Sequence, residues 1–130
     1  MPVKHDIRPQ VEKLSELPFE RLRVVQDISE LRIADTRLAI VFIFAEWSGP
    51  SVMALRRFTH LLATLDLGSL DVIILDNDCM SGEETACLFG HVFHGYGEML
   101  WIRDGRVVAE LPRFQPESEA LILSHTRELL

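Results

Sequence analysis

The stretch that decides the fold covers residues 38–51 and reads Leu-Ala-Ile-Val-Phe-Ile-Phe-Ala-Glu-Trp-Ser-Gly-Pro-Ser. Its first half, 38–44, is an unbroken apolar run rich in β-branched and aromatic residues, which predicts a strand buried on both faces. Ser48 is a predicted helix N-cap, and Pro50 suits the first helical turn. Apolar residues then recur at helical spacing over 52–65. The pattern therefore predicts a buried strand, a tight turn and a long helix.

The rest of the chain supplies the elements of one α/β domain. The predicted elements begin with a short helix between Asp6 and Pro18, a strand at Leu22–Val25, and a helix over Ile28, Leu31 and Ile33 opened by an Asp27–Glu30 capping box. The strand and helix already described come next, followed by a strand at Val72–Leu75 and a helix at Glu83–Phe89. A hairpin of Met99–Ile102 and Val107–Ala109 around Asp104-Gly105 and a terminal helix behind Pro116 end the series. A strand, a helix and a strand at this spacing form a βαβ unit with parallel pairing. The order predicts a central mixed sheet, a βαβ half followed by a ββα half, flanked by helices.

Composition narrows the class of protein. The chain has 130 residues and is 48% hydrophobic, which suits one domain with its own core. The net charge of −7 lacks the basic footprint that nucleic acid or an anionic membrane requires, so neither is an expected partner. Two cysteines make no disulfide framework, and neither a signal-peptide h-region nor a run long enough to span a membrane stands in the sequence. A cytoplasmic location is expected.

Residues 45–51, Ala-Glu-Trp-Ser-Gly-Pro-Ser, resemble the active-site segment Ala-Glu-Trp-Cys-Gly-Pro-Cys of the thioredoxin family, with serine at both cysteine positions. Further structural residues of the family pattern are matched by Asp76, Gly95 and Gly105. The resemblance covers about residues 22 to 130. It implies a thioredoxin-like fold over 21–130, with 1–20 as an N-terminal helical extension.

The resemblance also shows which chemical groups are missing. Thioredoxins attack a disulfide with a thiolate and resolve the product with a second thiol, and a serine hydroxyl cannot replace either sulfur. The family's buried carboxylate falls at Phe42, its cis-proline at Gly97, and the basic residue after its second cysteine at Val52. A serine mutant made to trap a redox protein would have kept the carboxylate and the proline. The serines are therefore interpreted as native, and dithiol oxidoreductase activity is not expected.

Other reactive side chains have a plainer interpretation. Ser48 and Ser51 would need an adjacent base to act as nucleophiles, and no histidine neighbours them in sequence, so helix capping is expected. Cys79 and Cys87 match no redox motif and are predicted to be ordinary thiols, with a redox-sensing pair as the alternative. A zinc set of these two cysteines with His91 and His94 fits no common ligand spacing. Neither a metal nor a cofactor is expected.

A binding surface is the alternative use of the degenerate active site. Its predicted residues are Trp47, Ser48, Gly49, Pro50, Ser51, Tyr96 and Gly97. In the family this turn and the loop opposite dock partner segments, and exposed aromatic side chains are typical anchors of such contacts. The plain alternative is that Trp47 only packs. Gly97 in place of proline predicts a backbone free to pair with a peptide.

Two classes of function follow. The leading hypothesis is a non-catalytic thioredoxin-like protein that binds another, unidentified protein as a chaperone, assembly factor or regulatory subunit. The family includes small hydrogenase-maturation factors without the cysteine pair, and an immunity-type binding protein fits the acidic charge equally well. The alternative is a thiol-dependent redox or glutathione-linked protein using Cys79 or Cys87, although glutathione-binding members usually keep the proline found at Gly97. The oligomeric state stays open.

Overall fold

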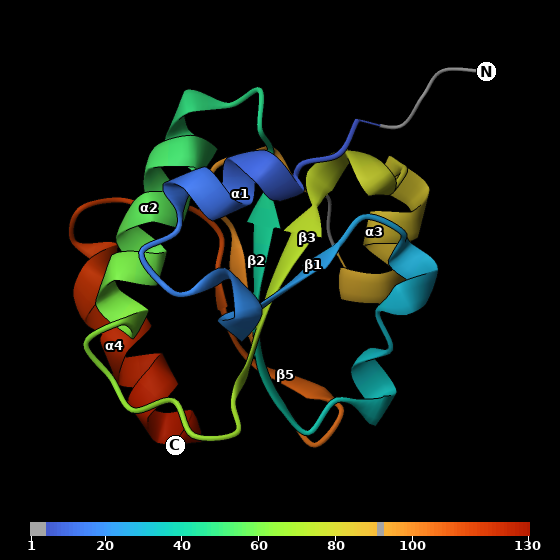
Figure 1. Cartoon of the computed structure of the whole chain (residues 1–130). Helices are drawn as coiled ribbons and strands as arrows, with labels where there is room; N and C mark the ends of the chain where they lie inside the picture. Colours follow the sequence, from blue (N-terminus) through green and yellow to red (C-terminus); the bar gives the residue numbers. More distant parts are fainter. Residues whose placement is uncertain (1–4, 91–92) are drawn as a thin grey trace.

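The computed structural model describes residues 5–90 and 93–130, apart from the side chains of Cys87 and Leu88. Within this part of the chain, strands form one sheet in the order β1-β3-β2-β4-β5 (Figure 1). The bounds are β1 Leu22–Val25, β2 Leu38–Phe44, β3 Asp71–Asp76, β4 Met99–Arg103 and β5 Arg106–Leu111. The β1–β3 and β2–β3 pairs are parallel, whereas β2–β4 and β4–β5 are antiparallel. The predicted mixed sheet of a βαβ half and a ββα half is confirmed.

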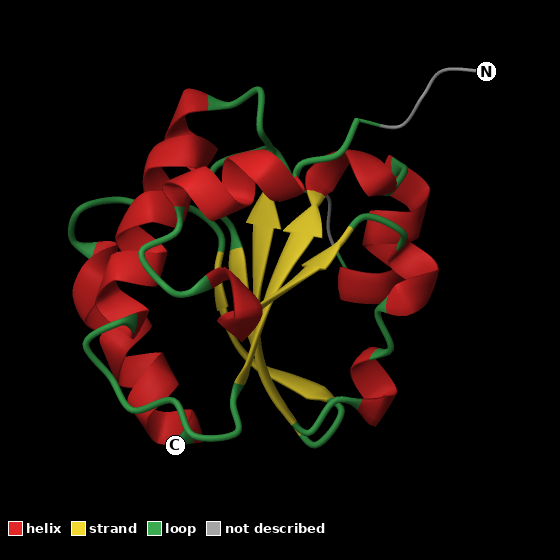
Figure 2. Cartoon of the chain, viewed as in Figure 1, coloured by secondary structure: helices red, strands yellow, loops and turns green. Residues whose placement is uncertain are grey.

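Helices cover both faces of the sheet. Their bounds are α1 Arg8–Leu14, α2 Gly49–Leu62, α3 Gly82–Phe89 and α4 Ser118–Leu129. Helices α1, α2 and α4 lie on one face, and α3 lies on the other (Figure 2). Side chains of a strand alternate between faces, so Phe42 and Phe44 join the apolar cluster under α2 while Val41 and Ile43 join the cluster under α3. This two-sided burial explains why β2 reads as a continuous apolar run.

The predicted helix over Ile28, Leu31 and Ile33 is wrong. The chain forms two 3₁₀ turns instead, Ile28–Glu30 and Ile33–Asp35, with Leu31 and Arg32 extended between them. The Asp27 carboxylate accepts a hydrogen bond from the Ser29 N–H at 3.0 Å, two residues on. This bond closes a tight local turn, so the aspartate caps a single turn rather than a continuing helix.

The N-terminal segment packs onto the domain. Its apolar side chains belong to the same cluster as those of β2 and α2, namely Ile7, Val11, Leu14 and Leu17. Helix α1 starts after Ile7 rather than after Asp6, whose carboxylate accepts a hydrogen bond from the Arg8 N–H at 3.0 Å. The division into 1–20 and 21–130 stays a prediction, and residues 1–4 lie outside the described residues.

The second half of the domain follows the sequence pattern closely. Asp104 and Gly105 have φ values of 49° and 79°, the two left-handed residues that a tight hairpin turn requires. Helix α4 is joined to α2 by Arg57, whose guanidinium donates to the Glu119 carboxylate at 2.8 Å and 3.1 Å. These hydrogen bonds hold the pKa of Glu119 below its ordinary value. None of the helices in the described ranges is long and apolar enough to cross a membrane.

Candidate functional site

The candidate site is the turn that joins β2 to α2 at the carboxyl ends of the parallel strands (Figure 1). Ser48 is the N-cap of α2, as predicted, and its hydroxyl accepts a hydrogen bond from the Ser51 N–H at 3.4 Å. The same hydroxyl donates to the carbonyl oxygen of Gly95 at 2.6 Å. Ser48 thus ties the start of α2 to the loop before β4.

Ser51 closes the turn from within. Its side chain is fully buried, and its hydroxyl oxygen accepts a hydrogen bond from the Ala45 N–H at 3.0 Å. Both serine hydroxyls are therefore hydrogen-bonded to the backbone, and neither has a hydrogen bond to a histidine in the described part of the chain. Without a base, a serine hydroxyl is a weak nucleophile. The two serines therefore stabilise the turn and do not form a catalytic pair, and we call Ser48 and Ser51 with these hydrogen bonds the serine clasp.

The positions that correspond to the buried carboxylate and the cis-proline of the thioredoxin pattern are occupied by Phe42 and Gly97. Phe42 is fully buried, and its ring stacks on Phe58 with the ring centroids 5.3 Å apart. Gly97 stands where the sequence comparison places the cis-proline, and the described residues contain no cis peptide bond. A carboxylate at the Phe42 position would be buried against the Phe58 ring, and burying a charge is costly.

The loop before β4 lies tightly against the turn and α2. Gly95 and Gly97 both have a φ of 79°, a left-handed conformation that favours glycine. A Cβ atom added at Gly95 would lie 3.0 Å from the Trp47 ring, and one added at Gly97 would lie 2.6 Å from the Ala54 Cβ. The two segments that the sequence analysis assigned to one surface are therefore in contact.

Trp47 is held by a hydrogen bond at its indole N–H and is nevertheless largely exposed. The indole N–H donates to the two carboxylate oxygens of Asp78 at 3.1 Å and 3.0 Å, yet 61% of the residue is exposed. Asp78 was not among the residues predicted for the site. Its position was a usable signal, because Asp78 follows β3 by two residues and β3 pairs in parallel with β2, which ends before Trp47.

Tyr96 is the second exposed ring of the site. It is 43% exposed, and the guanidinium carbon of Arg113 lies 5.2 Å from its ring centroid, within the range of a cation–π contact. Met53, one helical turn beyond the exposed Pro50, is 70% exposed. We call Trp47, Pro50, Met53 and Tyr96 the aromatic surface. Arg113 and Met53 carried no motif by which the sequence could have marked them.

The backbone of Tyr96, next to Gly97, is already hydrogen-bonded within the chain, and a backbone at Gly97 that is free to pair with a peptide stays a prediction. The Tyr96 N–H donates to the Glu98 carboxylate at 2.9 Å, and its carbonyl oxygen accepts from the Phe114 N–H at 2.9 Å. A peptide strand that paired with Tyr96 would have to displace one of these internal hydrogen bonds. The aromatic surface consequently offers side chains to a partner, not the backbone of this residue.

The structure describes one of the two cysteine side chains, that of Cys79. Cys79 ends a 3₁₀ turn, Asn77–Cys79, and is half-buried. The Cys87 side chain and His91 lie outside the described residues, so the zinc set and the cysteine pair are not placed. Among the residues that are described, no three or more histidine, cysteine, aspartate or glutamate side chains gather where they could hold a metal ion.

The Glu46 carboxylate lies beside the turn. One oxygen is 3.0 Å from the Nε2 atom of His5, in the segment before α1. The other oxygen is buried and has no hydrogen-bond partner among the described residues. His5 also accepts a hydrogen bond at its carbonyl oxygen from the Gln26 side chain at 2.8 Å. The N-terminal segment is thus attached to the ends of both β1 and β2.

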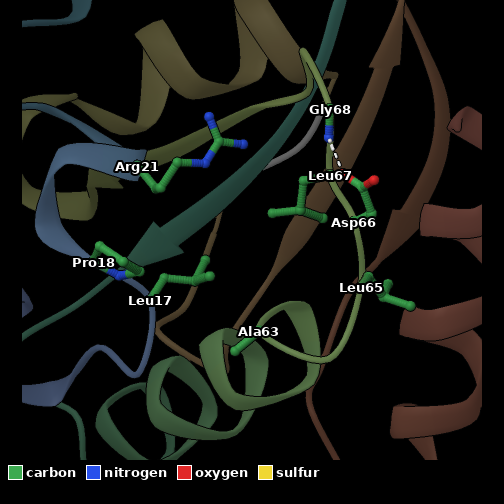
Figure 3. A pocket seen from close by; sticks show the side chains of 8 residues that line it. All are labelled: Leu17, Pro18, Arg21, Ala63, Leu65, Asp66, Leu67 and Gly68. Carbon is green, nitrogen blue, oxygen red and sulfur yellow. Dashed lines mark hydrogen bonds between the residues drawn. The ribbon is translucent and has the colours of Figure 1, made fainter.

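A groove of about 420 Å³ lies at the other end of α2 (Figure 3). Its polar side chains serve the local loop: Asp66 accepts a hydrogen bond from the Gly68 N–H at 3.2 Å, and Arg21 donates to the Leu70 carbonyl at 3.3 Å. Since α2 has 14 residues and rises about 1.5 Å per residue, this groove is about 20 Å from the serine clasp. It adds no group to the candidate site.

Comparison with solved structures identifies the fold. The chain is similar to the thioredoxin of Malassezia sympodialis, with a TM-score of 0.64 at 16% identity over 81% of this chain and 93% of that one. It is similar to the oxidised thioredoxin of Plasmodium falciparum, with a TM-score of 0.64 at 21% identity over 81% and 98%. Mitochondrial thioredoxin 3 of Saccharomyces cerevisiae gives a TM-score of 0.63 at 14% identity over 85% and 97%.

These likenesses define the class of protein: the chain has a thioredoxin-like fold. They cover nearly the whole of each neighbour, so the similarity is that of a complete domain. At identities this low the likeness concerns the fold and not the activity. No family model matches the chain, and no curated protein matches it in sequence.

Proposed function

We propose that this thioredoxin-fold protein is non-catalytic and binds another protein through the aromatic surface, as a chaperone, assembly factor or regulatory subunit. The observation that carries the proposal is that, within one turn, the two serine hydroxyls are occupied by internal hydrogen bonds while the neighbouring tryptophan is exposed. The hydroxyls of Ser48 and Ser51 are bonded to the backbone, whereas the adjacent Trp47 ring is 61% exposed. The reactive position serves the fold, and the neighbouring aromatic ring faces solvent.

The fixed orientation of Trp47 supports a binding role. A ring held by Asp78 loses little side-chain freedom on binding, so less of the contact energy is spent on ordering it. Tryptophan, tyrosine and arginine are also the residues most enriched among interface hot spots, and Arg113 adjoins Tyr96. An immunity-type binding protein would use the same surface, and the acidic net charge suits it.

A thiol-dependent function is the second candidate and is less well supported. Cys79 is half-buried and matches no redox motif, whereas reactive cysteines are usually accessible. A cytoplasmic location is part of the proposal and rests on the small number of cysteines.

Affinity capture from the source cells tests the proposal with a matched pair of variants. The double substitution Trp47→Ala with Tyr96→Ala removes the two aromatic anchors. The control, Val108→Ala with Leu121→Ala, removes two exposed apolar side chains on β5 and α4, outside the aromatic surface. We expect a protein that is retained by the wild type and the control and lost with the double variant.

Circular dichroism of all three proteins establishes that each bait is folded. Equal retention by the folded Trp47/Tyr96 variant would defeat the assignment of the surface. Loss with the control pair alone would move the interface to β5 and α4.

A further inference from the structure

Glu98 is a buried acid at the end of the loop that carries Tyr96. It lies between Gly97 and the start of β4, and only 3% of it is exposed. Among the described residues it is more deeply buried than Asp76, the other buried acid, which is 5% exposed. A buried carboxylate is costly unless hydrogen bonds compensate it, so its partners indicate what it does.

Both carboxylate oxygens of Glu98 accept hydrogen bonds from the loop that carries Tyr96. One oxygen accepts from the His94 N–H, and the other accepts from the Tyr96 N–H at 2.9 Å. The backbone carbonyl of Glu98 accepts from the Ile43 N–H of β2 at 2.9 Å. Glu98 thus connects β2, the central strand of the sheet, to the backbone N–H groups of His94 and Tyr96 in the loop.

The loop needs such a connection because of its glycines. Gly95 and Gly97 flank Tyr96, and glycine has the widest backbone freedom of any residue. Proline, which would restrict the backbone, is absent from residues 94–98. The side-chain carboxylate of Glu98 supplies the restraint instead, and it acts on the N–H of Tyr96 itself.

We propose that Glu98 is the positioning residue of the aromatic surface, and that its carboxylate holds the 94–96 backbone so that the Tyr96 ring is presented on that surface. This role rests on the proposed binding function, since the residue that Glu98 positions belongs to that surface. Glu98 itself does not touch the partner, because it is buried. Glutamine is the sharpest substitution, since its NH₂ group cannot accept one of the two hydrogen bonds.

The test is a pH titration of the isolated protein by NMR. The carboxyl carbon of Glu98 and the amide protons of His94 and Tyr96 are followed together. We expect both amide protons to shift with the same midpoint as the Glu98 carboxyl. In Glu98→Gln this response disappears, and hydrogen exchange at the two amides becomes roughly tenfold faster or more. Glu110→Gln, an exposed site on β5, is the control and leaves both measurements unchanged.

Neighbouring charges are separated by the same experiment. Any shift of these amide protons that arises from the nearby His94 imidazole persists in Glu98→Gln, so the variant separates it from the effect of Glu98. Arg113, whose guanidinium lies over the Tyr96 ring, is likewise present in both proteins. Wild-type amide protons that do not follow the Glu98 carboxyl would overturn the proposal, and this result requires no variant to fold. Unchanged exchange in a folded Glu98→Gln protein would overturn it as well.

The titration needs no binding partner, so it fails independently of the proposed function. Coupled titration together with undiminished capture by the Trp47/Tyr96 variant would leave Glu98 as the restraint of the loop and remove the binding surface. Loss of capture by the Trp47/Tyr96 variant alone, without coupled titration of the amide protons, would support the binding surface and remove Glu98 as the restraint of the loop.

Discussion

Replacing Gly97 by alanine is expected to lower the free energy of unfolding by about 2–4 kcal/mol. The new Cβ atom would lie 2.6 Å from the Ala54 Cβ and 2.9 Å from the Phe114 Cβ. Because the site is packed, Ala54 and Phe114 cannot both move away from it. The residue would also have to keep a φ of 79°, which alanine adopts at a cost. Urea unfolding followed by circular dichroism measures the change.

Gly90 is the matched control for Gly97. It has nearly the same conformation, with a φ of 81°, but an added Cβ meets nothing within 4 Å. Gly90→Ala should therefore cost only the backbone term, about 1 kcal/mol. The difference between the two variants isolates the contacts of the loop with Ala54 of α2 and with Phe114. Equal losses would mean that the loop does not pack against α2 as described.

Replacing Ser51 by alanine should destabilise the protein by about 1–3 kcal/mol. The buried Ala45 N–H loses the hydroxyl that now accepts its hydrogen bond at 3.0 Å, and no solvent reaches the fully buried Ser51 site to replace it. Thermal or urea unfolding of the variant gives the magnitude. The prediction follows from the clasp role of the serine and from nothing catalytic.

Ser124→Ala is the control for Ser51→Ala. Ser124 lies on the exposed side of α4, so the same exchange there changes helix propensity alone and is expected to stabilise slightly, by less than about 0.5 kcal/mol. If Ser51→Ala proved as harmless as Ser124→Ala, the hydroxyl would not be a structural clasp.

Much of the fold could be predicted because its strongest signals are local and redundant. Residues 38–44 had to be buried on both faces, and helix α2 followed from the N-cap at Ser48 and the apolar spacing behind it. The hairpin followed from Asp104-Gly105, one of the few residue pairs that tolerate two left-handed conformations in succession. The helix predicted at Glu83–Phe89 is found as α3, which begins one residue earlier behind a capping box of Ser81 and Glu84.

The failures lie where a tertiary or non-periodic interaction decides the structure. The pattern at Asp27–Glu30 was read as a helix start, yet the aspartate bonds to Ser29 and closes only one turn. The loop at 94–98 has no periodicity, so the sequence could place Tyr96 opposite the turn through resemblance but could not show that Glu98 and Phe114 occupy its backbone. Hydrogen bonds between such segments leave no mark on local residue spacing.

The contact between Trp47 and Asp78 could be predicted from the sheet order but not from local sequence spacing. Neither residue indicates the other by spacing, because 31 positions separate them. Parallel pairing of β2 with β3 nevertheless brings the ends of the two strands together, so the contact followed from topology once the sheet order was known. Charged residues just beyond parallel strands are therefore useful candidates for a site, even without a motif.

The central claim is that this fold acts by binding after losing its reactive sulfur, and the rate of disulfide reduction by the wild-type protein tests it most directly. Insulin is mixed with dithiothreitol and the protein, and precipitation is timed against a blank without protein. The account predicts a rate equal to the blank. A rate above the blank that disappears in Cys79→Ala or Cys87→Ala would contradict it and would make the protein a thiol-dependent catalyst.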